Sequence, residues 1–196
     1  MTERASGGVP DEELIRAVLG GDDGAYGVLV ERYKGRAFGV AVGIVGDGDD
    51  AMDVVQESFV KAYFNLKDFR FGSNFYTWFY RLLVNRAIDR WRKTGRSAEV
   101  RLDESWLSGD DSPPGSFAYP MTPEEILQHR ELGEALQRAV LELPEYHRAV
   151  ILLREVEGMA YEEIAKALGC SVGTVMSRLH YARGKLKSVL GSHREG

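Results

Sequence analysis

Apolar residues recur at intervals of three and four along most of this chain, which is the spacing of one face of an α-helix. Between clusters of Gly, Asp and Ser, this spacing predicts four helices in the first half, over 11–20, 25–45, 49–65 and 74–94. It predicts four more in the second half, over 122–141, 144–156, 161–168 and 171–190. No useful length of chain alternates apolar and polar residues as a strand does. The pattern therefore predicts an all-α fold.

The helical pattern stops between Ser97 and Met121, where turn-forming residues cluster and Pro113 and Pro114 cannot continue a helix. The next helix opens with Thr122 followed by Pro123, a capping residue and a proline at the first helical position. We therefore expect two small helical domains joined by a flexible linker. The expected parts are a disordered N-terminus (1–9), a four-helix domain (10–97), an acidic linker (98–121) and a second helical domain (122–196).

The second domain contains a short amphipathic helix, a tight turn at Gly169 and a further helix, which is the helix-turn-helix pattern. The last helix carries an apolar stripe at spacings of four, three and four, which predicts its buried side. That stripe is Val175, Leu179, Ala182 and Leu186. The opposite side of its N-terminal half is what such motifs insert into a major groove. The alternative is a packed helical hairpin with a solvated basic face.

The expected duplex contacts lie on this outward side and its flanks, where hydroxyl, imidazole, thioether and guanidinium groups suit base edges and phosphates. They are Thr174, Met176, Ser177, Arg178, His180, Tyr181 and Arg183.

The helix over 74–94 interleaves aromatic residues with arginines. Its expected core face is Tyr76, Phe79, Tyr80, Leu83, Ala87 and Trp91. A second face carries a ring, an amide and two guanidinium groups at helical spacing, a set that suits single-stranded nucleic acid because rings stack on bases and cations follow the backbone. That face is Trp78, Arg81, Asn85 and Arg92. Alternatively, Trp78 packs against another helix and the arginines are solvated.

The loop before this helix is expected to form one wall of a pocket for an extruded base, whose edge Asn85 would read. The candidate loop residues are Phe69, Phe71, Ser73 and Asn74.

For the helix over 49–65 we expect Met52, Val55, Phe59 and Tyr63 on the buried side. The opposite side would show Asp50, Asp53, Glu57 and Lys61, with Val54 and Phe64 exposed among them. A face of mixed charge with apolar islands is either a protein-binding surface or a solvated one.

The net charge of −5 argues against indiscriminate coating of nucleic acid, yet the basic residues are concentrated in two segments, 70–96 and 171–194. The single cysteine, Cys170, excludes an internal disulfide and fits a reducing cytoplasm. We expect no metal, no cofactor, no catalytic residue and no membrane insertion. An enzyme is disfavoured because no nucleophile–base pair, phosphate loop or metal cluster is visible in the sequence.

Several segments together resemble the extracytoplasmic-function (ECF) sigma factors of RNA polymerase, of the sigma-E type within the sigma-70 family. These are the segments 53–63 and 75–81, Leu143-Pro-Glu, and the segments 161–165 and 172–179, in this order along nearly the whole chain.

The resemblance implies that residues 10–97 are sigma region 2 and that region 4 begins near Thr122. It implies that Asp53, Gln56 and Glu57 contact the clamp helices of the largest polymerase subunit, and that region 4 contacts the flap. The loop over 69–74 with Asn85 would capture a flipped base of the promoter's minus-10 element, and region 4 would read the minus-35 element. The acidic linker would thread toward the polymerase cleft. An anti-sigma factor is an expected partner.

Two positions depart from the family pattern. Ala160 stands where many members have a Ser or Thr cap, at a cost of about 1 kcal/mol. Met176 stands where some members have arginine, so the minus-35 sequence cannot be carried over. The main rival is a conventional helix-turn-helix repressor or activator that binds duplex DNA without core polymerase, but it leaves the Trp78, Arg81 and Asn85 face unexplained.

Overall fold

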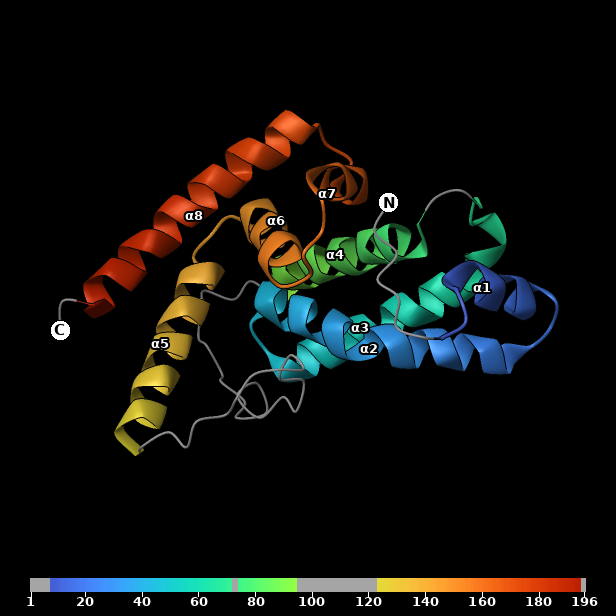
Figure 1. The fold of residues 1–196 in the computed structure, drawn as a ribbon, viewed down its shortest axis with the longest axis horizontal. Coiled ribbons are helices and arrows are strands. Elements are labelled where there is room, and N and C mark those ends of the chain that lie inside the picture. Colours follow the sequence, from blue (N-terminus) through green and yellow to red (C-terminus); the bar gives the residue numbers. More distant parts are fainter. Residues whose placement is uncertain (1–7, 72–73, 95–122, 195–196) are drawn as a thin grey trace.

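The computed structural model describes residues 8–71, 74–94 and 123–194 of the chain, and all of its regular elements there are helices (Figure 1). In chain order they are α1 (Asp11–Leu19), α2 (Asp23–Val45), α3 (Gly48–Phe64), the short 3₁₀ helix η1 (Leu66–Asp68), α4 (Phe75–Thr94), α5 (Pro123–Leu141), α6 (Glu145–Glu155), α7 (Tyr161–Leu168) and α8 (Val172–Arg194). The all-α expectation is confirmed. The expected linker and most of the expected N-terminal tail lie outside the described residues.

Helices α2, α3 and α4 pack against one another in the N-terminal half, and α1 lies on α2. Phe59 of α3 stacks on Phe79 of α4 with ring centres 4.4 Å apart, at the centre of this core. The Asp11 carboxylate accepts hydrogen bonds from Arg32 and Tyr33, which ties the first turn of α1 to α2. The aromatic face expected on α4 is largely buried, since Phe79, Tyr80, Leu83 and Ala87 are in the core and Tyr76 and Trp91 are partly covered.

Helix α3 is turned differently from the expected face. Val54 and Asp50 are buried rather than exposed, and Met52 and Tyr63 are exposed rather than buried. The cause is that α3 lies between α2 and α4 and buries a wide face toward both, a placement that the spacing along one helix does not specify. Val55 and Phe59 are buried and Phe64 is 68% exposed, as expected.

Helix α6 forms the centre of the C-terminal half. Six consecutive residues, from Arg148 to Leu153, are buried, because α6 packs against α2, α7 and α8. On α8, Val175, Leu179 and Ala182 are buried and Leu186 is partly buried, which confirms the expected stripe.

The helix-turn-helix geometry comes from two local features. Helix α7 ends at Gly169, whose φ of 63° lies in the left-handed region that glycine adopts without strain. Helix α8 then begins after Ser171, whose hydroxyl accepts the backbone N–H of Thr174 at 3.1 Å. The Ala160 side chain accepts no such bond at the start of α7, although the Glu163 carboxylate accepts the Ala160 N–H at 2.9 Å.

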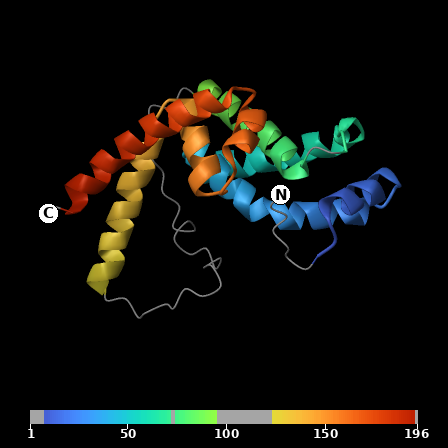
Figure 2. The ribbon, with the colours of Figure 1, turned by 45° about the horizontal axis from the view of Figure 1, so that its top comes forward.

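The two halves pack on each other, with α6 against α2 and α7 against α4. Both views show this contact, from which α5 and α8 extend away (Figures 1 and 2). A Cβ atom added to Gly43 of α2 would lie 2.7 Å from Cδ1 of Leu152 of α6. The backbone of α2 is therefore in direct contact with a core side chain of α6.

Two charged residues, Arg148 and Glu157, are buried at or beside this contact. The Arg148 guanidinium donates to the carbonyls of Val140, Leu141 and Leu143 of its own half and to that of Ile44 at the end of α2. Burial lowers the pKa of Arg148 to about 10. Carbonyl oxygens at helix ends are suitable partners for this cation because they are left without donors inside the helix.

Candidate nucleic-acid and polymerase interfaces

The second face of α4 is exposed at two of its central positions, Arg81 and Asn85. Trp78 is half-buried, since its ring packs edge-on against Phe69 at 5.5 Å and lies 5.7 Å from Phe75. The expected face therefore exists, but Trp78 supports it from one side rather than standing free in solvent.

Arg92, the last member of that face, is held by the other half of the chain. Its guanidinium donates to the Glu145 carboxylate of α6 at 2.7 Å. This hydrogen bond lowers the pKa of Glu145 below its ordinary range.

The loop before α4 divides into a buried and an exposed part. Phe69 is buried beneath Phe71, Phe75 and Trp78. Phe71 is 45% exposed, and the Arg16 guanidinium lies 5.2 Å above its ring. Ser73 lies outside the described residues.

Asn74 is exposed, and its side-chain oxygen accepts the backbone N–H of Tyr76 at 3.0 Å. This bond satisfies one of the free N–H groups at the start of α4. The Asn74 side chain therefore has a local structural role whether or not it also contacts a base.

The N-terminal half of α8 presents the expected outward side. Gly173, Met176, Ser177, His180 and Tyr181 are exposed. Thr174 is partly covered and shares a hydrogen bond with Ser171, and Arg183 is paired with Glu155 of α6 at 2.7 Å. The single cysteine, Cys170, lies in the turn near Arg178.

Guanidinium groups of α4 and α8 lie over the same aromatic ring. Arg92 of α4 lies 5.8 Å and Arg178 of α8 lies 4.9 Å from the centre of the Tyr146 ring. Such contacts are favourable because the face of an aromatic ring is electronegative. Arginines from the two expected DNA surfaces are therefore neighbours here.

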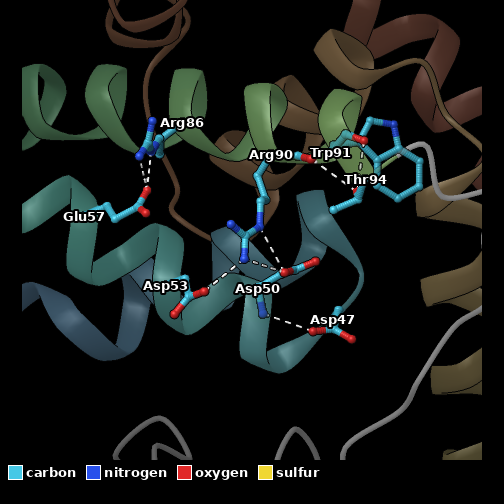
Figure 3. Close-up of polar contacts among 8 residues, drawn as sticks. All are labelled: Asp47, Asp50, Asp53, Glu57, Arg86, Arg90, Trp91 and Thr94. Atoms are coloured by element: carbon cyan, nitrogen blue, oxygen red, sulfur yellow. Dashed lines mark hydrogen bonds and ion pairs between the residues drawn. The ribbon is translucent and has the colours of Figure 1, made fainter.

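The acidic residues of α3 are paired with arginines of α4, as Figure 3 shows. Arg90 Nη2 lies 2.8 Å from Asp50 and 2.9 Å from Asp53, and Arg86 binds Glu57. Glu57 remains 44% exposed and Asp53 57% exposed, so each carboxylate has room for a second partner. Gln56 is exposed between them, and Met52 and Val60 on the same helix are also exposed.

Sequence reasoning missed the buried charges between the halves. Glu157, in the loop after α6, has a side chain 0% exposed and lies 2.9 Å from Arg36 of α2. It also accepts the Tyr76 hydroxyl of α4 at 2.8 Å. Burial, and then the Glu157 charge, raise the pKa of Tyr76 and Tyr80. Glu157 is a single charged residue in a short loop, so no periodic pattern in the sequence indicates that it is buried.

Among the residues that the structure describes, no group of His, Cys, Asp and Glu is arranged to hold a metal ion. Over the same residues, none of the helices is both long and apolar enough for a membrane span.

Residues 29–97 match the family described as Sigma-70 region 2, and residues 133–186 match Sigma-70, region 4. These two segments make up more than half of the chain, which therefore belongs to the sigma-70 family of transcription initiation factors. Such factors are not enzymes; they direct RNA polymerase to promoters. This membership favours promoter-directed initiation over the conventional repressor.

Within the family, the chain is similar to ECF sigma factors, which confirms the resemblance seen in the sequence. It is 40% identical over 178 residues to the ECF RNA polymerase sigma-E factor of Escherichia coli (strain K12), covering 88% of this chain and 90% of that one. It is 36% identical over 184 residues to the RNA polymerase sigma-H factor of Pseudomonas aeruginosa, covering 92% and 93%.

Two solved structures share the fold. CnrH, in complex with the cytosolic domain of CnrY, is 27% identical with a TM-score of 0.69, covering 93% of this chain and 97% of that one. The sigma factor RpoE of Bartonella quintana, in complex with the anti-sigma factor NepR, is 23% identical with a TM-score of 0.61, covering 85% and 96%.

Proposed function

We propose that residues 10–97 bind core polymerase and open the minus-10 element, and that residues 122–196 read the minus-35 element as duplex. The acidic stretch 98–121 connects them. The observation that carries this proposal is the presence of an exposed candidate DNA face on each half, around Arg81 and Asn85 on α4 and around Ser177 and His180 on α8.

At the minus-10 element, the extruded base would lie between the exposed Phe71 and Asn85, with Ser73 and Asn74 at the loop side. Stacking on an aromatic ring contributes about 1–3 kcal/mol per base. Phe69 and Trp78 support this site from beneath, because their rings are packed together. Arg81 and Arg92 would follow the phosphates.

At the minus-35 element, Ser177 and His180 would bond base edges, and Met176 with the Thr174 methyl would contact thymine methyl groups. Tyr181 lies on the same exposed side. Arg178 and Arg183 would bind phosphates.

The polymerase contact would be the exposed strip of α3 that carries Asp53, Gln56 and Glu57, bound to the clamp helices of the largest subunit, while region 4 would bind the flap. The apolar Met52 and Val60 beside these polar groups support a protein partner rather than a purely solvated face.

An anti-sigma factor is the other proposed protein partner, as in the Bartonella quintana complex. The cytoplasm is the proposed compartment, because core polymerase and promoter DNA are there.

The test is transcription from genomic promoter fragments by purified core polymerase, with and without this protein. Promoter-specific transcripts that require the protein are expected, and their absence would refute the assignment. Asn85→Ala should weaken permanganate reactivity of the melted region while leaving polymerase binding intact. Lys67→Ala, an exposed lysine outside all three faces, is the matched control. Unchanged permanganate footprints with Asn85→Ala would show that the melting face is misplaced.

A further inference from the structure

Helix α1 brings one arginine to the loop that precedes α4. The Arg16 guanidinium carbon lies 5.2 Å from the centre of the Phe71 ring, which is 45% exposed. The helix itself is fixed in place, because Ile15 is fully buried in the core and the Asp11 carboxylate is bound by side chains of α2. The packing of α1 therefore places Arg16 at this loop.

Arg16 is held less tightly than the arginine at the far end of α4. Its Nη2 atom is 3.4 Å from Glu12 Oε2, and both side chains are more than half exposed. By contrast, two nitrogen atoms of Arg92 donate to Glu145 Oε1, at 3.2 and 2.7 Å. A long, exposed ion pair is weak, because water screens both charges and competes for their hydrogen bonds. A phosphate that comes near can therefore take the place of Glu12.

An arginine that lies over an aromatic ring keeps its capacity for hydrogen bonds. The N–H groups of a guanidinium lie in its own plane, so the ring attracts the cation while the N–H groups remain available at its edge. Phosphate is a preferred partner, since it accepts charge-assisted hydrogen bonds from two of these groups at once. A nucleotide whose base stacks on Phe71 carries its sugar and phosphates at the edge of the stack, where the Arg16 side chain lies.

We propose that Arg16 is a further contact for the minus-10 element: when the extruded base stacks on Phe71, the guanidinium leaves Glu12 and binds a phosphate beside that base. The proposal rests on the proposed function, because it needs a base extruded at this loop. Arg16 approaches the strand from α1, whereas Asn85 approaches it from α4. Arg16 also precedes residues 29–97, so the match to Sigma-70 region 2 does not include it.

The salt dependence of DNA binding tests whether Arg16 contacts a phosphate. Holoenzyme made with wild-type or Arg16→Gln protein is titrated with a fork-junction DNA that is single-stranded across the minus-10 non-template strand, taken from a promoter that the wild-type protein transcribes. Loss of one phosphate contact should lower the slope of log Kd against log salt concentration by about 0.7. Kd should rise about 10-fold at low salt, the smaller effect expected for a hydrogen bond between charged groups.

Three variants accompany this measurement. Arg16→Lys keeps the charge and should keep most of the salt slope. Glu12→Gln removes the carboxylate that competes for Arg16 and should lower Kd by up to about 5-fold. Lys34→Gln removes a similarly exposed cation from an ion pair with Glu31, so it is the matched control and should change neither Kd nor the slope.

A scan of the DNA strand locates the contact. Phosphates of the single-stranded segment are replaced one at a time by neutral methylphosphonates, and the extruded base is identified by the rise in 2-aminopurine fluorescence. With wild-type protein, replacement beside that base should weaken binding about as much as Arg16→Gln does. With Arg16→Gln the same replacement should have little further effect, because the two changes remove one contact and their free energies are then not additive.

The outcomes separate this inference from the proposed function. If wild-type holoenzyme binds the fork no more tightly than a fork with a scrambled minus-10 sequence, the proposed function is wrong. If it binds specifically and Arg16→Gln keeps the wild-type Kd and slope, the Arg16 contact is wrong. A higher Kd with an unchanged slope would show that Arg16 only positions Phe71, which also refutes the phosphate contact. Circular dichroism of the free proteins checks that each variant is folded.

Discussion

The pairing of Glu57 with Arg86 allows the proposed polymerase contact to be tested apart from domain stability. Both side chains are 44% exposed, and exposed ion pairs contribute about 0–1 kcal/mol. Glu57→Gln and Arg86→Gln each break the same pair, so each should lower the free energy of unfolding by no more than about 1 kcal/mol. For a small domain this is a melting shift of less than about 8 °C.

Their effects on polymerase binding should differ. If the Glu57 carboxylate binds the clamp helices, Glu57→Gln removes a charge-assisted hydrogen bond of about 1.5–3 kcal/mol. This loss should raise the Kd for core polymerase by about 10- to 150-fold. Arg86→Gln keeps the carboxylate and removes its competing partner within the domain, so Kd should be unchanged or lower. Fluorescence anisotropy of labelled protein titrated with core polymerase measures both values.

Equal losses of affinity in the two variants would mean that Glu57 acts by holding α3 to α4 and not by touching polymerase. Unchanged affinity in both would move the contact elsewhere on α3. Thermal melts by circular dichroism accompany each titration, so a folding defect is not mistaken for a binding defect.

Three further predictions follow from the described contacts. Trp78→Ala should lower stability by about 2 kcal/mol because its ring packs on neighbouring aromatic rings, whereas Asn85→Ala should change it by less than about 0.5 kcal/mol; thermal melts check this, and equal melting of the two variants would contradict the packing. Ser171→Ala should lower the free energy of unfolding by about 1 kcal/mol because it removes a helix cap, and Ala160→Ser should raise it by a similar amount because it adds one. Urea unfolding measures both changes. No increase in Ala160→Ser would show that the start of α7 needs no hydroxyl. Burial, and then the charge of Arg178, lower the pKa of His147, so the His147 imidazole binds a proton more readily in the unfolded chain than in the folded one. The free energy of unfolding should therefore fall as the pH drops below about 6.5, and it should fall more steeply than in His147→Gln. An equal pH dependence of the two proteins between pH 7.5 and 5.5, measured by urea unfolding, would refute this.

The helices could be predicted from sequence because their ends depend on local chemistry. Ser171 and Gly169 mark the turn of the helix-turn-helix motif by properties of their own residues, and both boundaries agree with the structure. The buried stripe of α8 followed in the same way, because that helix buries a single narrow side.

The burial of α3 could not be predicted as well, because a helix covered on two sides buries residues that no single stripe contains. For this reason Val54 is buried where exposure was expected, and Met52 is exposed where burial was expected. The candidate DNA faces were accessible to sequence reasoning through the spacing of Arg81 and Asn85. The contact between regions was not, since Glu157 acquires partners only when distant surfaces meet.

The absence of a side chain at residue 43 allows the close packing of α6 on α2, and this requirement can be checked in other genomes. A paralogue with a bulky residue at the equivalent position could not place a leucine of α6 on α2 in this way. Surveying that one column across ECF sigma factors, together with the columns of Arg36 and Glu157, would therefore identify the members whose two halves can pack together in this way.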